Sequence, residues 1–183
     1  NKIEPDYSRP KQLVYANLQG ASTTRGGSLT LSQSLTALPI TYTVGATLMD
    51  VFIEEDGTSQ PLEFAPDYQG IVNATYRLPV DVRLDFTMNL TGPMKLPEYA
   101  PPFERDPISP RFAVHNIQLT KDIELSTGSI LQPYIAVENI TNYTQDSPLV
   151  APENHFGERF DTAYVYGHIH GRSLGLGFRW FQR

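Results

Sequence analysis

Residues 80–90, VDVRLDFTMNL, alternate strictly between apolar and polar side chains. Successive side chains of a β-strand point to opposite faces, so this stretch predicts a long strand with one apolar and one charged face. A strand of about ten residues can cross a bilayer at a tilt. An arginine facing lipid at mid-bilayer would cost about 2–4 kcal/mol, so Asp81, Arg83 and Asp85 are predicted to face a hydrated interior.

Strand-like segments recur along the whole chain, with turn signals between them and almost no helical periodicity. The 15 Pro, 13 Gly, 10 Tyr and 9 Phe among 183 residues also favour strands and turns over helices. The alternation predicts about eight strands. They cover residues 11–18, 25–36, 40–52, 70–78, 80–91, 112–121, 130–139 and 173–181.

The connections between these strands alternate in length. The short turns are residues 37–39, 78–80 and 122–129, and the long loops are residues 53–69, 92–111 and 140–172. The opening loop, residues 19–24, would lie at the same end as the long loops but is short. An antiparallel meander places every second connection at the same end, and outer-membrane barrels have short turns at one end and long loops at the other. The pattern therefore favours the wall of a transmembrane β-barrel.

Composition excludes several other classes. The formal net charge of -6 argues against nucleic acid as a partner, and the absence of Cys excludes disulfides and Cys-based zinc sites. The sequence contains no run of about 18 apolar residues, so it predicts no membrane-spanning helix. Residues 1–10 have neither the basic start nor the apolar stretch of a signal peptide. The sequence has no catalytic motif such as G-x-S-x-G, H-E-x-x-H or a phosphate-binding Gly loop, so no enzyme activity and no cofactor are expected.

Five patches of the sequence resemble one family, the TonB-dependent outer-membrane receptors. Each patch is short, but their order and spacing extend over nearly the entire chain. The patches are ANLQGASTTRGGSLTLSQSL (16–35), NLTGPMKLPEY (89–99), SPRFAVHNIQLTKDI (109–123), YIAVENITNYTQ (134–145) and FDTAYVYGHIHGRSLGLGFRWF (160–181).

The resemblance implies that residues 1–183 are the carboxy-terminal segment of such a receptor, the last third of a barrel of about 22 strands. It implies an outer-membrane location in a diderm bacterium, with lipid and lipopolysaccharide around the wall. Earlier barrel strands and a plug domain, through which the TonB complex supplies energy, would lie outside this chain. The cargo implied is a scarce nutrient: a siderophore with its iron, haem, cobalamin or a glycan.

Loops held by a rigid wall are where recognition residues usually lie. The candidate ligand-binding residues are Tyr99, Glu104, Arg105, His155, His168, His170 and Arg172. His168 and His170 are two apart and would share a strand face, a spacing that a metal can use. No acidic residue is evident to support them, so no metal site is predicted.

Aromatic residues near the loop bases have a structural interpretation. Girdles of aromatic side chains mark both membrane interfaces of outer-membrane barrels. We assign to such girdles Tyr99, Phe103, Phe160, Tyr164 and Tyr166 at one end and Trp180 and Phe181 at the other.

Two other folds remain open from the residues alone. A small autonomous barrel of about eight strands, acting as an adhesin or anchor, would pair its first and last strands around a filled interior. A secreted, glycan-binding β-sandwich would stack two sheets face to face.

Overall fold

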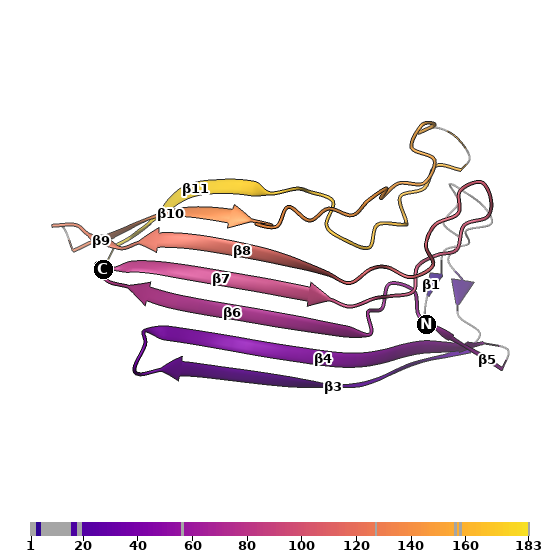
Figure 1. The fold of residues 1–183 in the computed structure, drawn as a ribbon, viewed down its shortest axis with the longest axis horizontal. Helices are drawn as coiled ribbons and strands as arrows, with labels where there is room; N and C mark the ends of the chain where they lie inside the picture. Colours follow the sequence, from indigo (N-terminus) through magenta and orange to yellow (C-terminus); the bar gives the residue numbers. More distant parts are fainter. Residues whose placement is uncertain are drawn as a thin grey trace.

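The computed structural model describes residues 3–4, 16–17, 20–55, 57–126, 128–155, 157 and 159–182. All regular structure in these residues is β-structure (Figure 1). The strands are β1 (Ile3–Glu4), β2 (Ala16–Asn17), β3 (Gly20–Leu35), β4 (Ile40–Glu55), β5 (Thr58–Pro61), β6 (Tyr68–Leu78), β7 (Val82–Thr91), β8 (Phe112–Lys121), β9 (Ile123–Glu124), β10 (Ile130–Glu138) and β11 (Ser173–Phe181). Within the described residues there is no helix with the length and apolar character to span a membrane.

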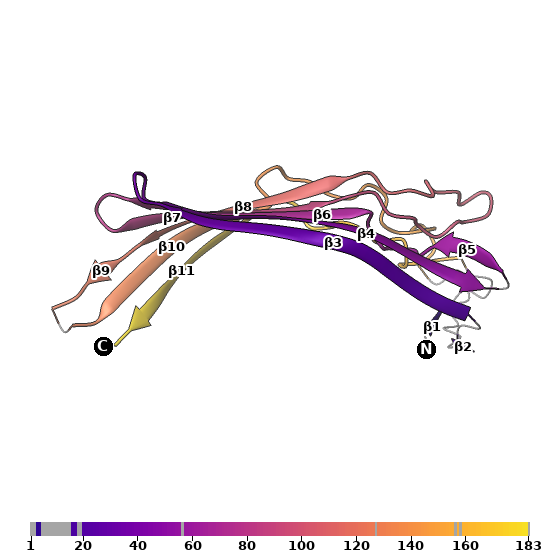
Figure 2. The ribbon, with the colours of Figure 1, turned by 90° about the horizontal axis from the view of Figure 1, so that it is seen from below.

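The main sheet is antiparallel throughout and runs in the order β11-β10-β8-β7-β6-β4-β3. The short strands β5 and β9 extend it by pairing with β4 and β10, and β1 pairs separately with β2. The sheet is a single arched layer, with β3 and β11 at opposite edges (Figures 1 and 2). In the described part of the chain no second sheet is stacked on it, and β3 does not pair with β11. These features differ from both the sandwich and the small closed barrel.

One face of the sheet is mainly apolar along every long strand, with the Arg25–Asp50 ion pair on β3 and β4 toward the long-loop end. Directly opposed residues of paired strands share a face, and Phe86 lies opposite Ala74 on one side and Ile117 on the other. No side chain of this face is buried under a second layer, and several are exposed, as in Leu29 (77%) and Phe178 (74%). Further large, exposed residues on it are Leu31, Val44, Leu48, Leu119, Ile135, Leu174, Leu176 and Trp180.

The other face carries hydroxyl, amide and charged groups that bond to one another. Cross-strand pairs join β3 to β4 and β7 to β8: the hydroxyls of Ser32 and Thr43 are 2.9 Å apart, and the Asn116 amide donates to the Thr87 hydroxyl at 3.1 Å. The polar side chains of this face therefore find hydrogen-bond partners within the sheet, without a second layer packed on it.

Several predicted strands are confirmed, and others have different boundaries. β8 and β11 begin and end where predicted, whereas β3 begins at Gly20, five residues early, so the expected opening loop at 19–24 is largely strand. Gly26 and Gly27 lie inside β3, as they do in the predicted strand at 25–36. Of the predicted strand 11–18, only residues 16–17 are among those described.

The strand predicted at 80–91 begins two residues later than expected. Val80 and Asp81 have positive φ angles of 61° and 58°, so they form the turn between β6 and β7 rather than the first residues of β7. The Val80 carbonyl accepts a hydrogen bond from the Lys121 ammonium, and the Asp81 carbonyl accepts one from the Asp122 amide at 2.9 Å. Asp81 is exposed in this turn, which corrects its predicted place on the strand.

Gly26 and Gly27 are adjacent in β3 but have different surroundings. A Cβ atom at Gly26 would lie 2.2 Å from the Leu48 carbonyl oxygen, whereas one at Gly27 would meet nothing within 4 Å. We expect Gly26→Ala to lower the free energy of unfolding by about 1–3 kcal/mol, because the overlap with backbone forces β3 and β4 apart. Gly27→Ala should change it by less than about 0.5 kcal/mol. Urea titration of the complete protein in detergent measures both, and equal effects would contradict the described register.

Candidate functional site in the long loops

The long connections all lie at one end of the sheet, opposite the short turns (Figure 1). We name residues 57–67 the first long loop, 92–111 the second and 139–172 the third. An isolated β-bridge joins Pro66 of the first loop to Met94 of the second. Two others lie within single loops, Lys95 with Ile108 in the second and Val150 with Asp161 in the third. Met94, Leu96, Val150 and Tyr164 form a buried cluster between the second and third loops, and Phe64, Tyr99, Phe103, Phe112 and Tyr166 pack around it.

Three hydrogen bonds tie the second loop to the third. The Tyr99 hydroxyl donates to Asp161 Oδ2 at 2.9 Å, and the Tyr164 hydroxyl donates to the Asp106 carbonyl at 3.1 Å. Arg105 Nη2 donates to the Leu149 carbonyl at 3.2 Å. These bonds connect residues up to 62 positions apart in the chain, so they fix the position of one loop against the other.

A buried glutamine fixes the middle of the third loop. Gln145 Nε2 donates to the Tyr164 carbonyl at 2.9 Å, and Gln145 Oε1 accepts from the Tyr166 and Gly167 amides at 2.9 Å each. Its own backbone amide donates to the His168 carbonyl at 2.8 Å. One side chain thus holds together two stretches of loop that have no strand to pair them.

A buried asparagine fixes the base of the same loop. Asn139 is fully buried and has a φ of 50°, which ends β10 and turns the chain into the loop. Its Nδ2 donates to the carbonyls of Tyr143 (2.7 Å) and His170 (3.1 Å), and its Oδ1 accepts from the Tyr143 amide at 2.9 Å. Asn139 therefore closes the third loop across its two ends.

The seven predicted ligand-binding residues do not form one cluster. Tyr99 and Arg105 are partly buried and hold the second loop against the third, as described above. Glu104 and Arg172 have exposed side chains, and the Arg172 amide donates to Asn142 Oδ1 at 2.7 Å. His155 lies in the third loop beside Phe160, with ring centroids 5.6 Å apart.

The expectation that His168 and His170 share a strand face is wrong. Both precede β11 and lie in the third loop, because the backbone at 168 and 170 is engaged by Gln145 and Asn139 rather than by a neighbouring strand. Their rings are edge to face, with centroids 6.5 Å apart. Among the described residues, no group of at least three His, Cys, Asp or Glu side chains is placed to hold a metal ion.

Four of the five aromatic residues assigned to a girdle near the loop bases, Tyr99, Phe103, Tyr164 and Tyr166, pack in the loop core instead. Tyr164 contacts Tyr99 and Tyr166 edge to face, with ring centroids 6.0 and 5.8 Å apart. The Tyr143 ring stacks on Phe112 at 5.1 Å, and the Arg159 guanidinium lies 5.3 Å from the centroid of the Phe103 ring. The sequence shows the aromatic composition of these loops, but the contacts join residues too distant in the chain to be paired by spacing.

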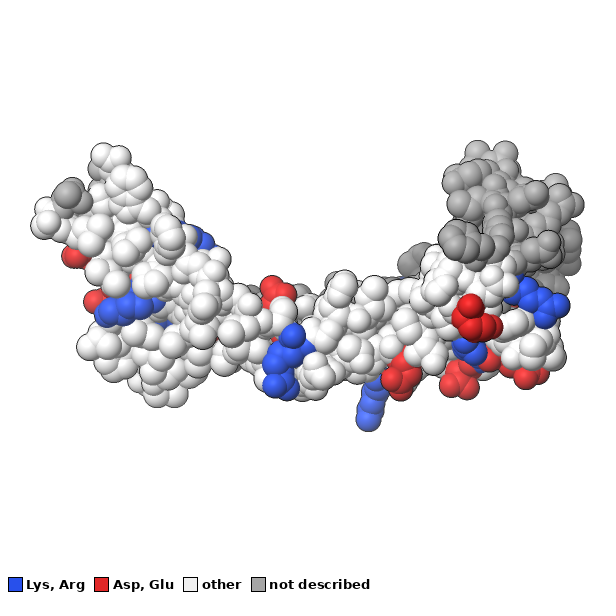
Figure 3. All heavy atoms as spheres, turned by 90° about the horizontal axis from the view of Figure 1, so that it is seen from above, with Lys and Arg blue, Asp and Glu red and all other residues white. Residues whose placement is uncertain are grey.

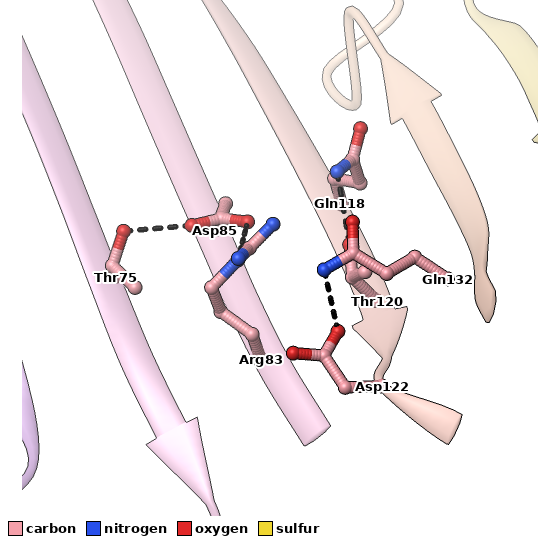
Figure 4. A network of polar contacts seen from close by, with 7 residues as sticks. All are labelled: Thr75, Arg83, Asp85, Gln118, Thr120, Asp122 and Gln132. Atoms are coloured by element: carbon pink, nitrogen blue, oxygen red, sulfur yellow. Dashed lines mark hydrogen bonds and ion pairs between the residues drawn. The ribbon is translucent and has the colours of Figure 1, made fainter. Parts of the chain in front are cut away.

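Two rows of polar contacts cross the polar face near the short turns (Figure 4). In the first, Asp85 accepts from the Thr75 hydroxyl at 2.7 Å and from Arg83 Nε at 2.9 Å. In the second, Gln118 Nε2 donates to the Thr120 hydroxyl at 3.0 Å and Gln132 Nε2 donates to Asp122 Oδ1 at 2.8 Å. On the face shown in Figure 3, acidic side chains are more numerous at the long-loop end, where basic side chains also lie.

The tyrosines of the loop core are held in their neutral form. Burial, followed by the neighbouring Tyr143, Tyr164, Asp146 and Asp106, raises the pKa of Tyr166 to about 12. Burial also raises the pKa values of Tyr143 and Tyr164, with Asp146 and Asp106 respectively as the next causes. A raised pKa favours the protonated phenol in the folded loops, so this contribution is complete below the ordinary tyrosine pKa of 10.0.

We therefore expect the loop core to lose stability as the pH rises from about 10 to about 12. Tyrosinate absorbance in the ultraviolet should show that some of the ten tyrosines ionise at a higher pH than the rest. Tyr166→Phe should remove the ionisation step at the highest pH. If all tyrosines titrate together near their ordinary pKa, the loop core is not packed as described.

No protein-family model and no curated protein matches the chain. Among solved structures it is similar to the ferric-catecholate import receptor Fiu from Escherichia coli K12 in its closed form, with a TM-score of 0.58 and 15% sequence identity. The similarity covers 99% of this chain and 23% of the Fiu chain. The chain therefore shares its fold with part of the barrel of that receptor. The predicted all-β, antiparallel barrel wall is thereby confirmed, and the long loops described above extend from one end of that wall.

Proposed function

We propose that the chain is a wall segment and loop-bearing part of an outer-membrane receptor that imports a scarce nutrient with energy supplied through TonB. The observation that carries the proposal is the exposed apolar face of a single-layered sheet, as in Leu29 and Phe178. Water is a poor solvent for so large an apolar surface, whereas the hydrocarbon of a bilayer suits it.

The opposite face is then the lining of a hydrated lumen. Arg83 and Asp85 lie on it, and their ion pair at 2.9 Å leaves the side chains about one-third exposed (34% and 27%). A neutralised pair with remaining access to water suits a wet interior, and an ionised side chain on the lipid side would be costly. Further barrel strands and a plug domain complete the proposed receptor.

The long loops are the proposed cargo-binding region. In outer-membrane barrels the longer loops are extracellular and the short turns periplasmic. The cargo classes proposed are a siderophore with its iron, haem, cobalamin and a glycan. A ferric siderophore is the first to test, because the similar structure is that of a ferric-catecholate import receptor.

Uptake by intact cells tests this function. Cells that depend on the complete protein should accumulate a radiolabelled ferric catecholate, and deleting either its reading frame or TonB should abolish accumulation. Haem, cobalamin and oligosaccharides, supplied in turn as sole nutrient sources, test the other classes. Recovery of the protein in the washed outer-membrane fraction supports the location. Recovery in the soluble fraction, or TonB-independent uptake of every cargo, would refute the proposal.

A further inference from the structure

The described residues have their buried apolar core in the loops and not in the sheet. The buried hydrophobic side chains are Met94, Leu96, Val150, Ala151 and Tyr164, and all of them lie in the second or third long loop. The third loop has no strand between β10 and β11, yet it contributes Val150, Ala151 and Tyr164 to this core. Segments without regular structure bury apolar side chains in this way when they fold as a packed unit.

Backbone hydrogen bonds connect the first loop to the second. The Phe64 amide donates to the Lys95 carbonyl at 2.9 Å, and the Asp67 amide donates to the Pro93 carbonyl at 3.0 Å. Within the second loop, the Leu96 amide donates to the Pro107 carbonyl at 2.8 Å. Residues 64–67 of the first loop thus lie alongside the second loop, which is itself folded back on the buried Leu96.

Side-chain hydrogen bonds connect the second loop to the third. The Tyr99–Asp161 and Tyr164–Asp106 bonds cross the boundary between them, and the Asp161 carboxylate also accepts from the Ala163 amide at 2.8 Å. In each of these bonds both the donor and the acceptor belong to the loops themselves. The contacts are continuous from Phe64 through Leu96 to Gln145.

We infer that the three long loops form one preformed body, folded before any ligand arrives and unfolding as a unit. This inference deepens the proposed function: it states that capture uses a surface that already exists, rather than loops that order around the cargo. A preformed surface avoids the loss of conformational entropy that ordering a loop on binding would require. The body would then move, if at all, as a whole against the wall.

Hydrogen exchange of the complete, ligand-free protein in detergent tests this inference. The amides of Leu96 and Ser109 in the second loop, and of Tyr166 and Gly167 in the third, have acceptors within the loop body. We expect them to exchange about 100-fold or more slowly than an unstructured chain, because exchange requires the body to open. Exchange at unstructured rates, slowed only when ferric catecholate is added, would overturn the inference.

A substitution tests whether the body opens as one unit. Gln145→Ala removes the side-chain oxygen that accepts from the Tyr166 and Gly167 amides. It leaves in place the backbone carbonyls that accept from the Leu96 and Ser109 amides. One cooperative body predicts that exchange at Leu96 and Ser109 also accelerates, by about tenfold or more. An effect confined to the third loop would show independent loops and refute the inference.

The matched control is Gln118→Ala, on the polar face of β8 and outside the loops. It should leave all four loop amides unchanged, and slow exchange of the β7 amides should confirm in both variants that the wall is folded. None of these measurements uses transport. A protein that imports no ferric catecholate can still show one loop body, and a transporting protein can still show independent loops, so the two failures are distinguishable.

Discussion

Phe86→Arg should prevent stable insertion of the protein in the outer membrane. Phe86 lies in the middle of β7 on the apolar face, between Ala74 and Ile117 of the neighbouring strands. An arginine facing lipid near the bilayer midplane costs about 2–4 kcal/mol in outer-membrane barrels. That is a large fraction of the net stability of a folded protein, which is about 5–15 kcal/mol. Urea unfolding in lipid vesicles and the amount of protein in the outer-membrane fraction measure the effect.

Thr87→Arg is the matched control, because it places the same charge one residue later on the opposite face. Thr87 accepts a hydrogen bond from Asn116 Nδ2, so its replacement should cost only about 1 kcal/mol. Insertion should remain near that of the unchanged protein. Equal losses from the two substitutions would mean that the apolar face does not contact lipid, and the proposed membrane function would then fail.

Asn139→Ala should detach the third long loop from the wall. The side chain of Asn139 makes three hydrogen bonds in a fully buried position. Their loss at roughly 1 kcal/mol each, and the further cost of a positive φ at alanine, together give about 4–5 kcal/mol. We expect faster proteolysis between residues 140 and 172 and weaker cargo binding, with the strands still protected. Limited proteolysis of the membrane-embedded protein measures the first effect.

Asn139→Gly separates the side chain from the backbone. Glycine also loses the three hydrogen bonds but adopts a φ of 50° without steric cost. It should therefore be less damaging than alanine by about 1–2 kcal/mol. If alanine and glycine are equally tolerated and the loop stays resistant to protease, Asn139 is not the residue that closes the loop.

Strand length, the alternation of side chains and the alternating length of the connections together favoured the wall of a barrel, although the residues alone also left a sandwich and a small closed barrel open. In β11 the pattern is uninterrupted, whereas in β8 Phe112, Ala113 and Val114 break the alternation; both ends of each strand were nevertheless predicted correctly. Where Val80 and Asp81 continue the alternation into a turn, the pattern extends too far, because periodicity does not register a positive φ. At β3 the predicted strand begins at Arg25, five residues too late, because Gly20 and the small polar residues after it resemble a loop.

The loops could not be predicted in the same way. Met94 and Leu96 are apolar residues in a Pro-rich segment without periodicity, and nothing local distinguishes them from exposed loop residues. Their burial depends on Val150 and Tyr164, more than 50 positions along the chain. Tyr99 and Arg105 were chosen as ligand residues from their chemistry, but in the structure the same donors serve contacts between loops.

The lateral margins of the sheet restrict what can adjoin it. Among the described residues, β3 offers a margin 16 residues long and β11 one of 9, each hydrogen-bonded on one side only. Inside hydrocarbon, the amides and carbonyls on the outer side of each require a companion strand. In the proposed barrel, a strand of about ten residues, the length that crosses a bilayer at a tilt, must therefore lie beside each margin. The described sheet would then join the rest of the wall at two separate seams, one beside β3 and one beside β11.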